Sequence, residues 1–151
     1  MLPSSPKRNN GRWFAPVIIG LALIGFADAT FLTVEHYRQA IIPCTIVHGC
    51  QVVTTSRYAT IGPIPIALLG ALYYLAVIVT VALTFEGQRP IWRRLLPWLT
   101  MSGFVFSLYL VALQAFVIHA FCLYCLLSAG TSTLIFLASL IRHRVFKRRE
   151  V

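Results

Sequence analysis

The feature that most constrains this chain is a long stretch without a charged residue. Between Leu95 and Ile141 there is no Lys, Arg, Asp or Glu. As a single helix this stretch would be roughly 70 Å long, at about 1.5 Å per residue, more than twice the ~30 Å hydrocarbon core of a bilayer. The stretch must therefore cross a membrane twice, and we expect it to turn back at His119–Phe121.

Two more apolar stretches precede it and complete the predicted architecture. We expect spans at about residues 15–34, 64–85, 97–118 and 122–141. The predicted fold class is therefore all-α, a polytopic membrane protein with a four-transmembrane-helix bundle and an extracytoplasmic loop between helices 1 and 2. Residues 15–141 would form one membrane domain, flanked by cytoplasmic tails at residues 1–14 and 142–151. A cleaved signal peptide is the alternative for the first span, but apolar residues continue past the small-residue site at Ala27–Ala29.

The distribution of charge sets the predicted orientation. The net charge is +9, yet only 11% of residues are charged, and the basic residues cluster at the ends of the apolar stretches. This pattern is typical of membrane topology and argues against a nucleic-acid-binding face. Of the 13 Lys and Arg, all but two lie in the tails and in the loop at residues 86–94. We therefore expect both termini in the cytoplasm and all four cysteines toward the extracytoplasmic side.

Two pairs of cysteines are the candidate reactive groups. Cys122 and Cys125 form a Cys-x-x-Cys on the first turn of the fourth span, where a helix N-terminus stabilises the thiolate of the leading cysteine. Cys44 and Cys50 form a second potential pair in the outer loop. A thiolate of one pair can attack the disulfide of the other through a mixed disulfide, so the two pairs can relay electrons without a metal.

Three other interpretations of the cysteines stay open at this point. Free cysteines are often inert packing residues in a buried core. The four could also form static disulfides that only stiffen the outer loop. A four-thiolate zinc site is disfavoured, because Cys44 and Cys50 are poorly spaced to supply half of one and the compartment is oxidising. We expect no metal.

Several motifs together carry a resemblance to a known family. They are the loop cysteine pair, a serine six residues after its second member, the Gly-Pro-Ile-Pro entry to the second span at 62–65, and Cys-Leu-Tyr-Cys-Leu-Leu-Ser-Ala at 122–129. With four spans, they resemble the vitamin K epoxide reductase family, specifically its bacterial members, over about residues 20–141. DsbB has similar chemistry and four spans, but its Cys-x-x-Cys lies in the first outer loop.

The resemblance implies thiol:quinone oxidoreduction in a bacterial inner (cell) membrane. A separate thioredoxin-like or DsbA-like extracytoplasmic protein would pass its electrons to the loop pair, then to the helical pair, then to a membrane quinone such as ubiquinone or menaquinone. By position, Cys44 resembles the cysteine that meets the partner and Cys50 the one that exchanges with Cys122. Cys125 resembles the cysteine facing the quinone, and Ser56 matches a serine near the active centre. From the residues alone, a cap at the loop end is an equal interpretation of Ser56.

The sequence also departs from the family pattern. The Asn and Tyr with which animal members hold the vitamin K ring fall at Ile66 and Ala129 here, which argues for a looser quinone site. One rival function keeps the chemistry but reduces vitamin K epoxide at the expense of partner thiols. A second rival is a non-enzymatic membrane scaffold with static disulfides.

Four polar residues near the cysteines are secondary candidates. His119 precedes Cys122 and could supply protons for quinone reduction, and Gln114 could donate a hydrogen bond to a quinone oxygen. His48 is more typical of a solvated loop residue. Asp28 is expected to be an interfacial carboxylate near water or Arg38, although an ionisable residue within a span is always a functional candidate. Tyr73 and Tyr74 are expected at helix contacts, with some aromatic residues bounding a quinone pocket.

Overall fold

Four long helices dominate the computed structural model, which describes residues 13–39, 49–86 and 90–147. They are α1 (Phe14–Arg38), α3 (Ile66–Glu86), α4 (Pro90–Leu113) and α5 (Leu123–Lys147). Each contributes a segment long and apolar enough to cross a membrane, the shortest being 19 residues. A span needs about 20 apolar residues. The expected all-α, polytopic four-helix architecture is confirmed.

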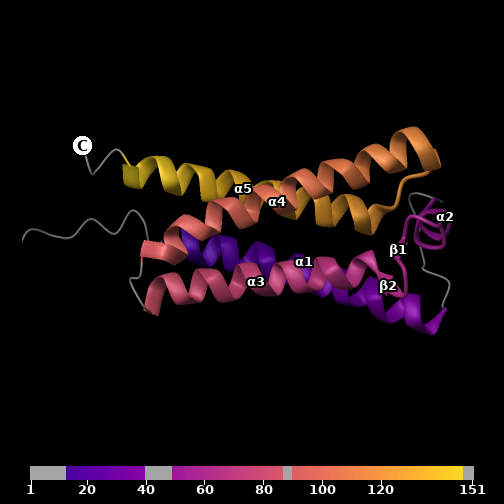
Figure 1. Ribbon diagram of the computed structural model, residues 1–151, viewed down its shortest axis with the longest axis horizontal. Coiled ribbons are helices and arrows are strands. Elements are labelled where there is room, and N and C mark those ends of the chain that lie inside the picture. Colours follow the sequence, from indigo (N-terminus) through magenta and orange to yellow (C-terminus); the bar gives the residue numbers. More distant parts are fainter. Residues whose placement is uncertain (1–12, 40–48, 87–89, 148–151) are drawn as a thin grey trace, which may run out of the picture.

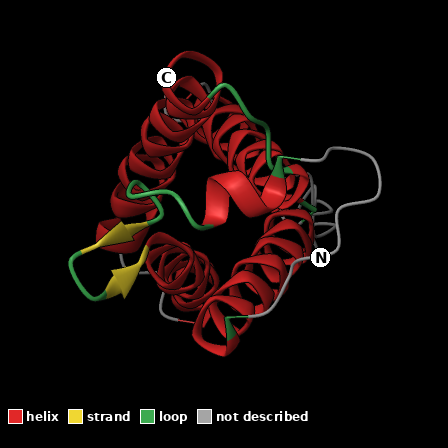
Figure 2. Ribbon diagram, turned by 90° about the vertical axis from the view of Figure 1, so that its right-hand side faces the viewer, coloured by secondary structure: helices red, strands yellow, loops and turns green. Residues whose placement is uncertain are grey.

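The four helices run side by side (Figure 1), and their contacts close them into a ring. Helix α1 packs against α3 and α5, and α4 packs against the same two helices from the opposite side. The view along the bundle in Figure 2 shows this arrangement from the end that carries α2 (Cys50–Thr54). Large apolar side chains such as Leu23, Leu72 and Leu108 remain exposed on the outside of the ring. This is the surface that a bilayer would cover.

Ten buried apolar residues of the long helices form one cluster, which we call the interhelical cluster. Its members are Ala15, Ile18, Ala22, Ala29, Ala71, Tyr74, Val77, Val81, Leu96 and Ile135. Many of them are small, which lets membrane helices approach closely. A Cβ atom at Gly25 of α1 would overlap the ring of Tyr74, and one at Gly103 of α4 would overlap the ring of Tyr73. Two adjacent tyrosines thus fix α3 against two different neighbours.

Residues 49–65, the described part of the segment before α3, lie at one end of the bundle. After α2, two short antiparallel strands, β1 (Thr60–Ile61) and β2 (Ile64–Pro65), form a hairpin (Figure 1). Its turn contains Gly62 with φ of 61°, a conformation that glycine adopts without strain. The N–H of Ile66 donates to the carbonyl of Ala59 at 2.9 Å, which ties the first residue of α3 to the residue before β1.

The reversal between α4 and α5 is built from a π-helical turn. Helix α4 continues into η1 (Gln114–Ile118), and His119 follows in the left-handed conformation with φ of 53°. The N–H groups of His119 and Ala120 both donate to the carbonyl of Gln114. The chain then turns, and α5 begins at Leu123, directly after Cys122.

Candidate functional site

Cys122 lies at the N-terminus of α5 with its sulfur turned back onto the helix. The residue is fully buried, and its carbonyl accepts an early helical hydrogen bond from Leu126 at 3.0 Å. Its Sγ accepts the N–H of Cys125 at 3.4 Å. A side chain in this position satisfies a backbone N–H that the helix leaves unpaired. Both cysteines are free thiols.

The surroundings of Cys122 favour its ionised form. A hydrogen bond from the side chain of Cys125 lowers the Cys122 pKa most. Burial opposes this, the backbone N–H groups of Cys125 and Tyr124 lower the pKa further, and a negative charge on Asp28 raises it. The balance lowers the pKa from 9.0 to about 7. Since the thiolate is the nucleophile in disulfide exchange, Cys122 is the activated member of the pair, as its place at the helix N-terminus predicts.

Hydrogen bonds to Gln114 fix the turn between α4 and α5 and the position of Cys122. The Gln114 side chain is buried, and its Oε1 accepts the backbone N–H of Cys122 at 2.9 Å. Because the backbone carbonyl of Gln114 also accepts the N–H groups at 119 and 120, one residue fixes both sides of the turn. His119, by contrast, is exposed and does not line the cavity described below.

The loop cysteine Cys50, which lies far from Cys122 in the sequence, packs next to it in the structure. It is the first residue of α2, fully buried, and held in a disulfide. Cys50 packs with Leu32, Val53 and Cys122 in a second buried cluster, which we call the cysteine cluster, and Cys125 packs against its edge. Cys44 and His48 lie outside the described residues.

A close backbone contact seats α2 on the start of α5. A Cβ atom at Gly49 would lie 2.6 Å from the carbonyl oxygen of Phe121 and 2.8 Å from its nitrogen. Those are backbone atoms that cannot rotate away, so the position admits only glycine without a shift of the loop. The contact joins the residue before Cys50 to the residue before Cys122.

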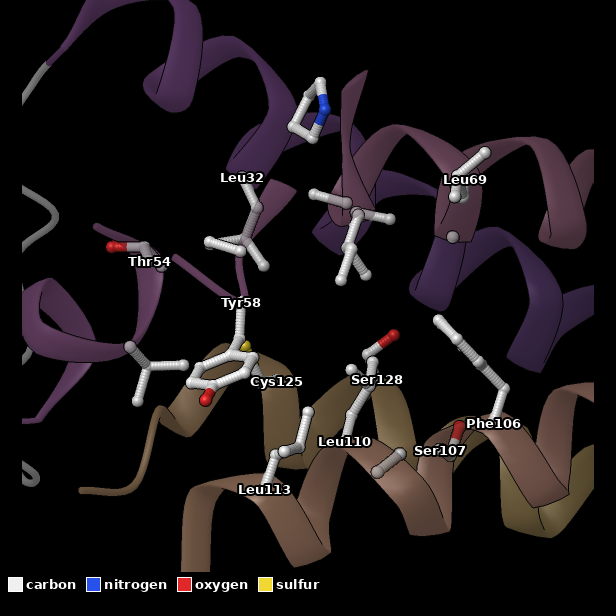
Figure 3. Close-up of a pocket in the computed structure, with 18 of the residues that line it drawn as sticks. Leu32, Thr54, Tyr58, Leu69, Phe106, Ser107, Leu110, Leu113, Cys125 and Ser128 are labelled. Atoms are coloured by element: carbon white, nitrogen blue, oxygen red, sulfur yellow. The ribbon is translucent and has the colours of Figure 1, made fainter. Parts of the chain in front are cut away.

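A cavity of about 480 Å³ opens beside the cysteine cluster, within the size range of small-molecule sites. Cys125 lines it, whereas Cys122 and Cys50 do not. Figure 3 shows the apolar wall and the few polar groups among it. Its apolar lining includes Leu32, Leu69, Phe106, Leu110 and Leu113, and its polar lining includes Gln114, Ser107 and Ser128. The cavity could accept a flat, largely apolar molecule with polar oxygens.

Three residues singled out by the resemblance also line this cavity. Ser56 donates its hydroxyl to the carbonyl of Val53 at 2.7 Å, so it caps the end of α2 while facing the cavity. Both interpretations of Ser56 therefore describe its position. Ile66 and Ala129 form apolar parts of the wall.

Sequence reasoning missed a group of hydrogen-bonded hydroxyls at the cavity wall. The hydroxyl of Tyr74 lies within hydrogen-bond distance of Ser128 Oγ and Thr131 Oγ1, both at 2.9 Å, and donates to the carbonyl of Ser128 at 2.7 Å. The signal was present: Ser128, Thr131 and Ser132 recur at helical spacing and mark the inward face of α5. Within the described residues, no group of His, Cys, Asp or Glu is placed to hold a metal ion.

The match to a known family model covers almost the whole membrane domain. Residues 16–140 match the family model described as the Vitamin K epoxide reductase family. Members of that family are membrane oxidoreductases that work with thiols, disulfides and quinones. The matched range includes all four cysteines, the cavity lining, the whole of α3 and α4, and most of α1 and α5.

Proposed function

The chain belongs to the vitamin K epoxide reductase family, and we propose that it is a thiol:quinone oxidoreductase that reoxidises a separate thioredoxin-like, DsbA-like protein. The electrons pass through Cys44 and Cys50 to Cys122 and Cys125 and then to a membrane quinone, so the protein supports disulfide formation. The observation that carries the proposal is the meeting of Cys50 with Cys122 in one buried cluster, with Cys125 between that cluster and a cavity.

The proposed reaction is balanced at each step. A partner thiolate attacks the loop disulfide, and the second partner thiol resolves the mixed disulfide, leaving the partner oxidised and the loop reduced. The Cys50 thiolate then attacks a Cys122–Cys125 disulfide in the same way. Finally the Cys122–Cys125 dithiol gives two electrons to the quinone and closes its disulfide. In the proposed sequence, Cys50 in a disulfide with Cys122 and Cys125 as thiols would be the stage before quinone reduction.

The cavity is the proposed quinone site. Ubiquinone and menaquinone both have a flat ring, which suits the apolar wall formed by residues such as Leu110 and Phe106. Cys125 lines the cavity and would face the ring, and the side-chain NH₂ of Gln114 is one donor available for a quinone oxygen, since its Oε1 accepts Cys122. His119 is exposed and does not line the cavity, so we do not assign the proton supply to it. The apolar Ile66 and Ala129 favour quinone over vitamin K epoxide.

The proposed location is the bacterial inner membrane with the cysteine end outside the cytoplasm. Arg94, at the start of α4, and Arg142 and Arg144, near the end of α5, lie at the end of the bundle opposite α2 (Figure 1). Basic residues are retained on the cytoplasmic side of membrane proteins. The redox partner would then meet the loop in the oxidising compartment, where disulfides persist.

The direct test uses Cys125→Ala in purified protein. We expect no partner oxidation with added quinone, because the helical pair cannot form its disulfide. The matched control is Ser139→Ala, a similar truncation on the same helix at a buried residue outside the cavity. Partner oxidation by Cys125→Ala at the wild-type rate would refute the relay.

Two further arms separate the rival functions. Supplying vitamin K epoxide and a dithiol tests the epoxide reductase, which predicts turnover with the epoxide and not with ubiquinone or menaquinone. Alkylation of the cysteines during changes of the quinone pool tests the scaffold. A scaffold would keep its disulfides closed throughout.

A further inference from the structure

The two cysteines of α5 occupy the positions of a helix capping motif. Helix α5 begins at Leu123, so Cys122 is its N-cap residue and Cys125 is its third residue. In a capping box, the N-cap side chain accepts the N–H of the third residue, and the third side chain accepts the N–H of the N-cap residue. The first bond is present, because Cys122 Sγ accepts the N–H of Cys125. The thiol of Cys125 is only a weak acceptor, so the second bond needs another source.

Gln114 supplies this second bond from the end of the preceding helix. Its Oε1 accepts the N–H of Cys122 at 2.9 Å. A backbone N–H can only donate, so the amide oxygen, and not the amide nitrogen, must face it. Gln114 is only 2% exposed, which shields the bond from water. Loss of the oxygen would therefore leave a buried donor unpaired.

The backbone at Gln114 fixes the place from which its side chain reaches Cys122. Gln114 is the first residue of the π-helical turn η1, and its carbonyl accepts the N–H groups of His119 and Ala120. The same residue thus closes the turn through its backbone and holds Cys122 through its side chain. The position of Cys122 is tied to the end of α4 as well as to its own helix.

This restraint should act differently on the two oxidation states of the helical pair. In the disulfide, the covalent bond to Cys125 already fixes Cys122 to the first turn of α5. In the dithiol that bond is absent, and the hydrogen bond to Gln114 helps to keep the Cys122 sulfur beside the N–H of Cys125. A thiolate in that place is stabilised by the helix N-terminus, whereas a disulfide sulfur carries no charge to stabilise. The restraint therefore favours the reduced pair.

We propose that Gln114 is a positioning residue that raises the reduction potential of the Cys122–Cys125 pair by holding Cys122 at the start of α5. The inference rests on the proposed function, in which this pair receives two electrons from the loop dithiol. In that exchange the loop dithiol becomes a disulfide as the helical disulfide becomes a dithiol, so electrons and protons balance. A higher potential of the helical pair favours electron flow from the loop toward the quinone.

The first measurement is the reduction potential of the helical pair in glutathione buffers at one pH, with neither quinone nor partner present. Cys44→Ser and Cys50→Ser remove the loop pair, so that alkylation of the remaining thiols reports the helical pair alone. In this background we expect Gln114→Met to shift the equilibrium about tenfold toward the disulfide, a fall of about 30 mV. Methionine keeps the length of the side chain but offers only a weak acceptor. Gln114→Asn, whose amide is one methylene shorter, should shift the potential in the same direction.

A matched control is available on the same helix. Thr100 of α4 is fully buried, and its hydroxyl donates to the carbonyl of Pro97 in its own helix. Thr100→Val removes a buried polar group away from the cysteines and should leave the potential unchanged.

The second measurement separates positioning from general support of the fold. A residue that only packs would stabilise the oxidised and reduced proteins equally, and its loss would leave the potential unchanged. We expect Gln114→Met to lower the Tm of the reduced protein more than the Tm of the disulfide form. Thr100→Val should change both Tm values by the same amount.

Two results would overturn the inference. One is a wild-type or raised potential in the Gln114 variants, and the other is an equal change of Tm in the two oxidation states. Either would make Gln114 a packing residue and not a determinant of the potential. Failure of the wild-type protein to reduce quinone would instead refute the proposed function. Because the potential is measured without quinone, the two failures are distinguishable.

Discussion

The two buried clusters of this protein are built in different ways. The interhelical cluster draws all its members from long helices, and Gly25 of α1 leaves room for the ring of its member Tyr74 on α3. The cysteine cluster combines α1, the five-residue helix α2 and the turn before α5. Beside it, the close approach of Gly49 to the backbone of Phe121 joins two segments outside the membrane-spanning helices.

This difference should separate stability from the proposed electron transfer. Contacts between long helices hold the bundle together, so damage to them should lower the free energy of unfolding. The contact of α2 with the start of α5 is small and lies at the end of the bundle (Figure 2). Damage there should leave the bundle intact and change the approach of Cys50 to Cys122. Substitutions at the two glycines can test this separation.

The largest effect is expected from Gly49→Ala. The new Cβ would meet the Phe121 backbone at 2.6 Å, so α2 must move away and Cys50 with it. We expect partner-driven turnover to fall by about 100-fold, since displacement of a reacting group by about 1 Å has effects of that order. Stopped-flow mixing of reduced partner, enzyme and quinone measures it.

A control distinguishes docking from general damage. Reduction of quinone by the chemically reduced Gly49→Ala protein should keep the wild-type rate, because Cys122, Cys125 and the cavity are unchanged. Gly130→Ala, at a helical position with open space around it, should leave both rates unchanged. Wild-type partner turnover in Gly49→Ala would show that the contact does not position the loop.

A smaller effect, on stability, is expected from Gly25→Ala. The added methyl group would overlap the fully buried Tyr74 ring, and overpacking of this kind costs about 1–3 kcal/mol. Thermal unfolding in detergent should show a lower Tm. Gly20→Ala on the same helix meets nothing within 4 Å and should raise the Tm slightly, because alanine favours helix. Equal Tm values for the two variants would contradict the importance of this contact.

The smallest effect is a shift in the titration of Cys122. Its lowered pKa means that the thiolate is present above pH about 7 and absent below it. Thiolate absorbance near 240 nm of the reduced protein should therefore rise through that pH. Cys125→Ala should move the midpoint upward toward the ordinary value of 9.0, because it removes the hydrogen bond that lowers the pKa most. An unchanged midpoint would mean that the helix N-terminus alone sets the pKa.

Sequence reasoning placed the membrane-crossing segments because hydrocarbon forbids charge in any arrangement of the helices. The uncharged stretch from Leu95 to Ile141 is too long for one crossing, and the structure turns it back between Ile118 and Leu123. The spacing of Cys122 and Cys125 likewise predicted a pair on the first turn of a helix, which is a local property. The family match over residues 16–140 confirms the resemblance that these motifs carried.

The sequence did not show which face of each helix points into the bundle. Lipid and protein interior are equally apolar, so the helices carry no clear hydrophobic stripe to show which side is buried. Tyr73 and Tyr74 are adjacent in sequence yet pack against α4 and α1 respectively. Asp28 was expected at the interface, whereas packing of α1 against α3 and α5 buries it.

The sequence by itself therefore determined the number of crossings, the helical cysteine pair and the family, because each depends on local composition or spacing. Only the tertiary structure decided that Cys50 meets Cys122, that Gln114 holds the Cys122 backbone, and that Cys125 faces a cavity. These contacts join residues far apart in the chain. Their geometry depends on how four similar apolar helices rotate against one another, and that rotation is set by packing.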